Sequence, residues 1–175
     1  MKDNKLNLSI FFGFLLIYKN ELNLLKATVG KDVVVLNKRK SSVGFIDKID
    51  ELDEKLINIL KKSILVKGFE VTKLGKYQFT EYKEGDFYDW HMDLLMSNPC
   101  PNLFMRKFSA TVFLSKPEDF KGGEFMIGRK SDGTHEDIIR HDQGSMVLFP
   151  SFMWHKVNPV LSGQRFSLVV WCEGD

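Results

Sequence analysis

The chain has 175 residues, of which 43% are hydrophobic and 27% charged, and its formal net charge is +2. This length and balance predict one globular domain over residues 1–175 with a sizeable core. Because no basic stripe alternates with aromatic residues, we expect no specific nucleic-acid binding. The two cysteines, Cys100 and Cys172, are too few for a disulfide framework. They indicate reduced thiols, which predicts a cytoplasmic location.

Residues 9–18 form an apolar run, SIFFGFLLIY, close to the start of the chain. Acidic and amide residues dilute the charge before it and no small-residue cleavage site follows, so a signal peptide is not favoured. The run is also too short to cross a bilayer as a helix. We expect a buried first helix or strand there, and a helix within residues 8–27 that covers one face of a sheet. We do not expect a membrane protein, although the apolar run leaves an N-terminal association open.

Residues 28–46 contain two short β-prone stretches, VVVL and SVGFI, separated by the basic segment 37–40, NKRK. A run of basic residues between two strands indicates a solvated loop. Residues 47–66 have apolar side chains at helical spacing, acidic residues in the first half and lysines later, which predicts an amphipathic helix. We therefore expect residues 1–68 to form mainly helical support for the rest of the chain.

From residue 69 onward the pattern changes to short strands separated by turns rich in proline and glycine. Eight or so closely spaced strands that follow helices are typical of a β-barrel or a two-sheet jelly roll packed on helices. The predicted fold class is α+β, mainly β, with a jelly-roll or cupin-like core over residues 69–173.

His91 and Asp93 are the first candidates for a metal site. In a strand, residues two apart point to the same face, so an imidazole and a carboxylate would project together. A third ligand could come from His135, His141 or His155. The first two fall in polar turns and are expected to be exposed, whereas His155 lies in an aromatic stretch. Two histidines and one carboxylate with open positions are typical of non-haem Fe(II) oxygenases, although a His-x-Asp pair alone is a weak signal.

Arg165 follows His155 by ten residues and begins the last predicted strand. A turn that contains proline and glycine separates them, so we expect the two residues on adjacent antiparallel strands. Arg165 and Ser167 share one face of the last strand, and Trp171 lies on that face as well. An arginine fork beside a hydroxyl can bind a carboxylate through two hydrogen bonds.

Taken together, these motifs carry a family resemblance that covers about residues 69–171. The chain resembles the 2-oxoglutarate- and Fe(II)-dependent dioxygenases of the prolyl 4-hydroxylase-like branch, and it is similar to the bacterial PKHD-type hydroxylases. That resemblance implies a double-stranded β-helix as the core. The stretches that carry it are YKEGDFYDWHMD, SATVFLS, EDFKGGEF, GSMVLFPSFMWHKVNPV and GQRFSLVVW.

The resemblance implies a role for each matching residue. It assigns the iron ligands to His91, Asp93 and His155. It gives Arg165 the distal carboxylate of 2-oxoglutarate, and gives Tyr82 and Ser167 supporting contacts to this cosubstrate. Tyr88 and Trp90 lie beside the metal ligands and are candidates for substrate contact, with core packing as the alternative.

The implied reaction is hydroxylation of a C–H bond, coupled to decarboxylation of 2-oxoglutarate to succinate and CO2. Fe(II), 2-oxoglutarate and O2 are the implied cofactors, with L-ascorbate as an optional one. The substrate would be a small molecule or a peptidyl residue such as proline, and the loop 94–104 is a candidate lid. Two alternatives stay open: a non-catalytic metal-binding or sensing module, and a different cupin-like metalloenzyme that uses His135 or His141. The oligomeric state is left open.

Overall fold

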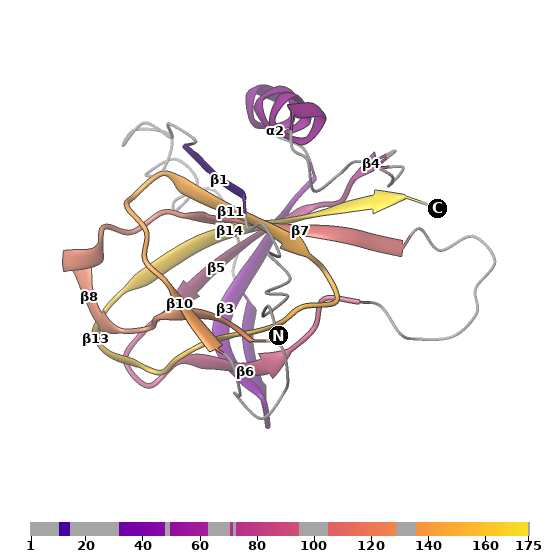
Figure 1. Cartoon of the computed structure of the whole chain (residues 1–175). Coiled ribbons are helices and arrows are strands. Elements are labelled where there is room, and N and C mark those ends of the chain that lie inside the picture. Colours follow the sequence, from indigo (N-terminus) through magenta and orange to yellow (C-terminus); the bar gives the residue numbers. More distant parts are fainter. Residues whose placement is uncertain are drawn as a thin grey trace, which may run out of the picture.

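A computed structural model describes residues 11–14, 32–47, 50–62, 71, 73–94, 105–128 and 136–174. In these residues the chain is a curled antiparallel β structure with one α-helix on its outside (Figure 1). Several sequence predictions fall outside the described residues: most of the apolar run 9–18 and of the helix at 8–27, the residues Cys100 and His135, and the loop 95–104.

The described helix is α2, Asp50–Lys62, and a short 3-10 helix spans Pro117–Asp119. The described strands are β1 Phe11–Phe14, β2 Asp32–Leu36, β3 Arg39–Ile46, β4 Lys73–Leu74, β5 Tyr77–Tyr82, β6 Phe87–His91, β7 Met105–Phe113, β8 Phe120–Gly122, β9 Phe125–Gly128, β10 Glu136–Ile139, β11 Ser145–Pro150, β12 Trp154–Val157, β13 Val160–Gly163 and β14 Arg165–Gly174.

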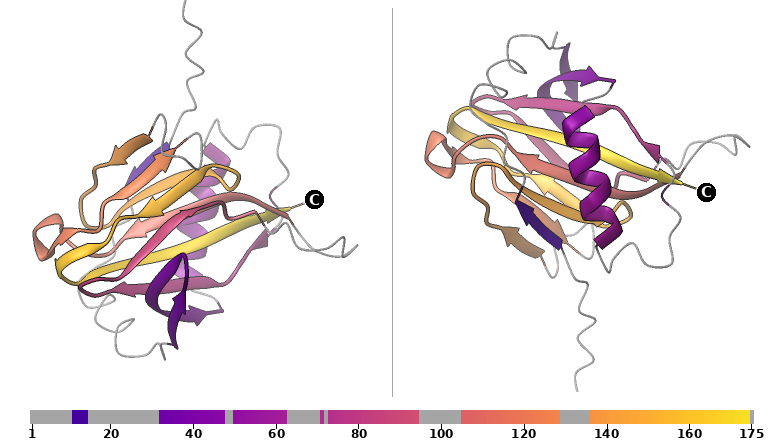
Figure 2. Two further views of the ribbon diagram at one scale, coloured as in Figure 1. Left: turned by 90° about the horizontal axis from the view of Figure 1, so that it is seen from below. Right: turned by 90° about the horizontal axis from the view of Figure 1, so that it is seen from above.

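The main sheet has the strand order β1-β11-β7-β14-β5-β3-β6-β12-β9-β10, while β2 pairs with β3, β4 pairs with β14, and β8 and β13 form a separate pair. The sheet curls, so that its two halves face each other (Figures 1 and 2). The first half consists of β1, β11, β7, β14 and β5, and the second half consists of β6, β12, β9 and β10. Strand β3 connects the halves because it pairs with β5 through Ser42–Ile46 and with β6 through Arg39 and Lys40. The predicted jelly-roll fold is therefore confirmed.

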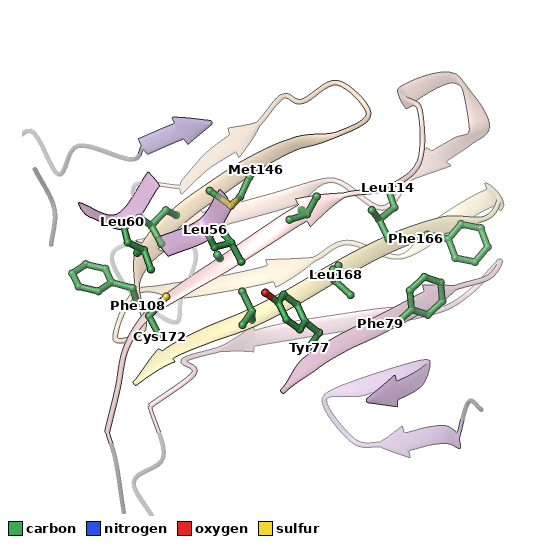
Figure 3. Close-up of a cluster of buried hydrophobic side chains, with 14 residues drawn as sticks. Leu56, Leu60, Tyr77, Phe79, Phe108, Leu114, Met146, Phe166, Leu168 and Cys172 are labelled. Carbon is green, nitrogen blue, oxygen red and sulfur yellow. The ribbon is translucent and has the colours of Figure 1, made fainter. Parts of the chain in front are cut away.

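Two hydrophobic clusters hold the described layers together. In the first cluster, Leu56 and Leu60 of α2 pack onto the outer face of the first half of the sheet. They contact side chains such as Phe108 and Met146 (Figure 3). The helix lies across β14 on this face, as the right view of Figure 2 shows. The second cluster contains residues of both sheet halves, and buries aromatic rings such as Phe113, Phe125 and Phe149. Burial of this apolar surface is the main favourable term in folding, and the candidate site adjoins the second cluster.

The helix predicted at residues 47–66 is confirmed as α2, with narrower bounds. Its acidic first turns include Asp53, whose carboxylate accepts a hydrogen bond from the Tyr77 hydroxyl of β5. Burial and this carboxylate both raise the pKa of Tyr77. The contact anchors the helix to the sheet at a polar point beside the apolar cluster. No helix among the described residues is long and apolar enough to span a membrane.

Three expectations for the first third of the chain are corrected. Phe11–Phe14 form a strand that pairs with β11, so these residues are not part of the helix expected within 8–27, although a strand was one of the two forms expected for the run 9–18. The described part of residues 1–68 contains β1, β2 and β3 as well as α2, so it is not mainly helical. The basic segment 37–40 is a turn only at its first two residues. Arg39 and Lys40 belong to β3, and Arg39 is buried because β6 pairs beside it.

The expected pairing of the two strands that carry His155 and Arg165 is also wrong. Strand β12 pairs with β6 and β9, whereas β14 pairs with β4, β5 and β7. The connection between them is not a simple turn, because it contains β13, which pairs with β8. His155 and Arg165 therefore reach the site from opposite halves of the curled sheet.

Candidate active site

Three metal-capable side chains converge where β6 and β12 lie side by side. His91 ends β6, Asp93 follows two residues later, and His155 is paired directly with His91 in the register of β12. The Asp93 carboxylate lies 3.8 Å from Nε2 of His91 and 3.5 Å from Nε2 of His155. One ligand atom from each residue lies within 4.8 Å of the other two. This spacing suits three donors to one ion.

A β-bulge in β6 turns an additional ring toward the cluster. His155 pairs with His91 and Val157 pairs with Tyr88, so three steps along β6 face two steps along β12. The extra residue places Tyr88 and His91 on one face despite their odd separation. Their rings stack with centroids 3.5 Å apart and planes at 10°. The bulge therefore makes Tyr88 a neighbour of the metal cluster.

Backbone carbonyls orient both imidazoles. Nδ1 of His91 lies 2.8 Å from the carbonyl oxygen of Asp89, and Nδ1 of His155 lies 2.9 Å from that of Met153. A carbonyl can only accept, so Nδ1–H is the donor in each case and Nε2 keeps a free lone pair toward the cluster. Burial, reinforced by the neighbouring His155, lowers the pKa of His91 to about 3. The His91 ring is therefore neutral at physiological pH, as a metal ligand must be.

Asp93 is held by contacts from outside its own motif. Ser109 of β7 donates a hydrogen bond of 2.6 Å to the Asp93 carboxylate and lies 3.0 Å from the Ser151 hydroxyl. The Asp93 amide also donates to the carbonyl of Ser151, at 2.9 Å. Burial raises the pKa of Asp93, but the two histidines and the Ser109 hydrogen bond outweigh it and hold this pKa below its usual range. Two neutral nitrogens and one charged oxygen are a donor set that suits Fe(II).

Arg165 supplies a buried positive charge on the opposite wall. Its side chain is 1% exposed, and its Nη1 donates to the Ser167 hydroxyl at 3.3 Å. Its Nε and Nη2 have no hydrogen-bond partner in the described structure. The guanidinium carbon lies 5.3 Å from the ring centroid of Tyr82. Burial lowers the pKa of Arg165. Because an unpaired buried cation is costly, this geometry suits a bound anion.

One cavity of about 330 Å³ joins these groups. It is lined by nearly all the residues that the sequence singled out, namely His91, Asp93, His155, Arg165, Tyr82, Ser167, Tyr88 and Trp171. Trp90 is not among its lining residues. The Trp90 ring instead lies under Nζ of Lys156, at 4.9 Å from the ring centroid.

The same cavity is lined by two arginines that the sequence analysis did not assign to it, Arg39 and Arg106. Arg39 was placed in a solvated loop. In the structure Arg39 shares one face of β3 with Ser41 and Val43, and all three are buried. Arg106 lies in β7, and no motif in the sequence singled out its side chain.

His141 is neither an exposed loop residue nor a member of the metal cluster. Its ring stacks on Phe113 with centroids 3.6 Å apart and planes at 3°. Burial, with help from the charge of Arg165, lowers the pKa of His141 to about 4. The expected exposure is thus corrected, because the turn that contains His141 folds back onto an aromatic ring of β7.

A curled jelly roll that gathers two histidines, one aspartate and a buried arginine around one cavity defines the architecture of a non-haem iron oxygenase. The family model described as the 2OG-Fe(II) oxygenase superfamily matches residues 77–173, which are 97 of 175 residues. The chain therefore belongs to the 2OG-Fe(II) oxygenase superfamily. The resemblance inferred from the sequence is confirmed at this level.

Related sequences narrow the likeness to one branch. A PKHD-type hydroxylase of Shewanella baltica is 36% identical over 95 residues, which are 54% of this chain and 41% of the relative. Another, of a Psychrobacter species, is 40% identical over 97 residues, which are 54% of this chain and 36% of the relative. In these comparisons the chain spans about two fifths of the length of its curated relatives.

Solved structures of prolyl hydroxylases show a similar fold. The viral collagen prolyl hydroxylase of Paramecium bursaria Chlorella virus-1, solved as a 2OG complex, has a TM-score of 0.74 at 18% identity and covers 95% of this chain and 96% of its own. A prolyl-4-hydroxylase of Pseudomonas putida has a TM-score of 0.68 at 19% identity, with 95% and 92% covered. At such low identity the likeness shows the fold alone.

Proposed function

We propose that the protein is an Fe(II)- and 2-oxoglutarate-dependent dioxygenase that uses O2 to hydroxylate a C–H bond, while 2-oxoglutarate is decarboxylated to succinate and CO2. One observation carries the proposal: the metal-capable triad and the buried, partly unpaired Arg165 line the same cavity. A keto acid with two carboxylates matches both groups, since one end can bind a metal and the other a guanidinium.

In this proposal His91, Asp93 and His155 hold the iron, which supplies the activation of O2 when bound. Arg165 binds the distal carboxylate of 2-oxoglutarate through its unpaired N–H groups, and Ser167 orients the guanidinium. Burial raises the pKa of Tyr82, so its phenol stays protonated and can donate a hydrogen bond to the cosubstrate. Tyr88 is a substrate contact, since its ring lies on that of His91.

The finer assignments are proposals of the same kind. We infer a prolyl 4-hydroxylase-like substrate, peptidyl or small. In support, a similar fold, with a TM-score of 0.62, occurs in a prolyl hydroxylase of Trichoplax adhaerens solved with a peptide fragment of a hypoxia inducible factor. We also propose L-ascorbate as an optional cofactor. We propose a cytoplasmic location as well, and the free, buried thiol of Cys172 supports it. We also infer that residues 1–175 act as one domain.

The test is succinate formation from 2-oxoglutarate in the presence of Fe(II), O2 and a panel of peptides, amino acids and nucleotides. His91→Ala and Asp93→Ala should abolish substrate-dependent succinate. Arg165→Ala should raise the 2-oxoglutarate KM by about tenfold to a hundredfold, because a charge-assisted hydrogen bond contributes about 1.5–3 kcal/mol.

Arg140→Ala is the matched control, since Arg140 is exposed and lies outside the cavity. It should leave the 2-oxoglutarate KM unchanged. Full turnover by Asp93→Ala, or an unchanged KM in Arg165→Ala, would exclude the proposed roles of these residues.

A further inference from the structure

The cavity has an excess of positive side chains. Among its described lining residues there are three arginines, Arg39, Arg106 and Arg165, but only one carboxylate, that of Asp93. In the proposed function, the two positive charges of Fe(II) and that of Arg165 offset the two carboxylates of 2-oxoglutarate and that of Asp93. The charge of Arg39 is then left without a counter-ion among the described lining residues, and buried charges are usually paired. Arg106 is influenced by Glu173, but the carboxylate of Glu173 also pairs with Lys73 at 3.4 Å.

Arg39 is the more deeply buried of the two, at 9% exposed. Its Nε donates to the Ser41 hydroxyl at 2.8 Å, and its guanidinium carbon lies 4.5 Å from the centroid of the Tyr88 ring. Its Nη2 is buried and has no hydrogen-bond partner in the described structure. The guanidinium is thus fixed by neutral groups on one side, and one N–H edge is left for a ligand.

Arg106 is a second cation that lines the same cavity. Its guanidinium lies over the Trp171 ring, at 3.7 Å from the centroid, and its Nη1 makes a long contact of 3.4 Å with the carbonyl oxygen of Asp93. Its Nε is buried without a partner. Arg106 therefore lines the same cavity as Tyr88 and Arg39, whose guanidinium lies over the Tyr88 ring.

From these observations we propose that the primary substrate carries a carboxylate, which Arg39 binds with Arg106 as the second cation. The inference rests on the proposed function and names its substrate class. Tyr88 shows how far Arg39 lies from the metal cluster, because its ring contacts both Arg39 and His91. A carboxylate bound by Arg39 would be separated from the metal ligand His91 only by the Tyr88 ring. The C–H bond that is oxidised should therefore belong to the same small acid, or to the same C-terminal residue of a peptide, as the carboxylate.

The size of the cavity agrees with this substrate class. Its volume of about 330 Å³ is at the small end for ligand pockets. The backbone of an internal peptide segment would present only neutral carbonyls, which accept hydrogen bonds but leave the charge of Arg39 uncompensated. A carboxylate satisfies both the N–H edge of Arg39 and the charge.

The test uses the anaerobic Fe(II) protein saturated with 2-oxoglutarate, in which the visible absorption band of the keto acid chelate confirms that the proposed site is assembled. Calorimetric titration then compares N-acetylated amino acids, including N-acetyl-L-proline, with their uncharged amides. At least one acid should bind at least tenfold more tightly than its amide, and Arg39→Gln should remove most of that preference. Tripeptides that end in the same residue show whether the carboxylate is that of a free acid or of a peptide C-terminus.

Lys38→Gln is the matched control, since it makes the same charge change at the adjacent, exposed position. It should keep the acid-to-amide preference. Arg39→Lys retains the charge and should keep part of it, whereas a purely structural role of Arg39 would alter thermal stability without changing the preference. If Arg39→Gln does not fold, Arg106→Gln takes its place.

The inference is wrong if no acid binds more tightly than its amide, or if Arg39→Gln keeps the full preference, in protein that shows the band. If the band itself is missing, it is the proposed function that fails.

Discussion

Asp93 shows how much of the site depends on single residues outside the recognisable motif. Its carboxylate is held by Ser109, which comes from another strand and in turn contacts Ser151. Groups that orient a metal ligand in this way commonly change metal affinity by about 10–100-fold when they are removed.

Ser109→Ala should therefore weaken Fe(II) binding by about tenfold or more, because the carboxylate loses the hydrogen bond that fixes its orientation. The measurement is a competition titration against a metal-binding dye under anaerobic conditions. Ser115→Ala is the control, since Ser115 is equally buried but accepts a hydrogen bond from the Phe166 amide and has no contact with the cluster. Equal Fe(II) affinity of Ser109→Ala and the unaltered protein would show that Ser109 does not orient the ligand.

Among single residues, those that belong to a short sequence motif could be predicted from the sequence. His91 and Asp93 are two positions apart, and Arg165 begins a clearly apolar strand. Arg39 was missed because its burial depends on β6 at its other edge, a long-range pairing that a basic run such as NKRK does not reveal. Ser109 was missed for a similar reason, since a serine in a strand is ordinary until its partner is known.

Among the elements, the pair β8 and β13 determines how the chain enters β14. Gly163 ends β13 with φ +81°, and a Cβ there would lie 2.2 Å from the carbonyl oxygen of Asp119. Gly123 follows β8 with φ +64°, and a Cβ there would lie 3.2 Å from Cδ of Arg165. These close approaches require glycine, and they set the position from which Arg165 enters the cavity.

Gly163→Ala should destabilise the protein by about 2–5 kcal/mol, because it combines a left-handed backbone with a backbone clash. We also expect a higher 2-oxoglutarate KM, since Arg165 lies two residues away. Urea unfolding and steady-state kinetics measure the two effects. Gly85→Ala is the control: its φ is +79°, but the nearest atom to a Cβ would be Nζ of Lys40 at 3.7 Å, so a cost of only about 1 kcal/mol is expected. Equal losses in both variants would rule out the clash as the cause.

Element positions were predictable where the pattern was regular, as in α2 and β14. Pairing was not. The assumption that sequence neighbours are spatial neighbours placed His155 beside Arg165, yet β13 intervenes and pairs elsewhere. The bulge that brings Tyr88 onto His91 also has no signature in the sequence, because it exists only relative to the partner strand.

Across the whole molecule, the site combines side chains from widely separated parts of the chain. Arg39 comes from β3, the metal cluster from β6 and β12, and Arg165 from β14. The curl of the sheet brings them together, and α2 covers the opposite face without touching the cavity (Figure 2). The fold class was predictable because many short strands after a helix allow few architectures. The composition of the cavity was not, since it depends on how the two sheet halves face each other.

Addition of 2-oxoglutarate to the anaerobic Fe(II) protein tests the central claim most directly. If the triad holds iron and Arg165 holds the far carboxylate, a weak visible charge-transfer band should appear, and Arg165→Ala should need about tenfold to a hundredfold more 2-oxoglutarate to produce it. Asp93→Ala should give no band. Two results would contradict the account. In one, the unaltered protein binds iron but shows no band when 2-oxoglutarate is added. In the other, Asp93→Ala shows an undiminished band.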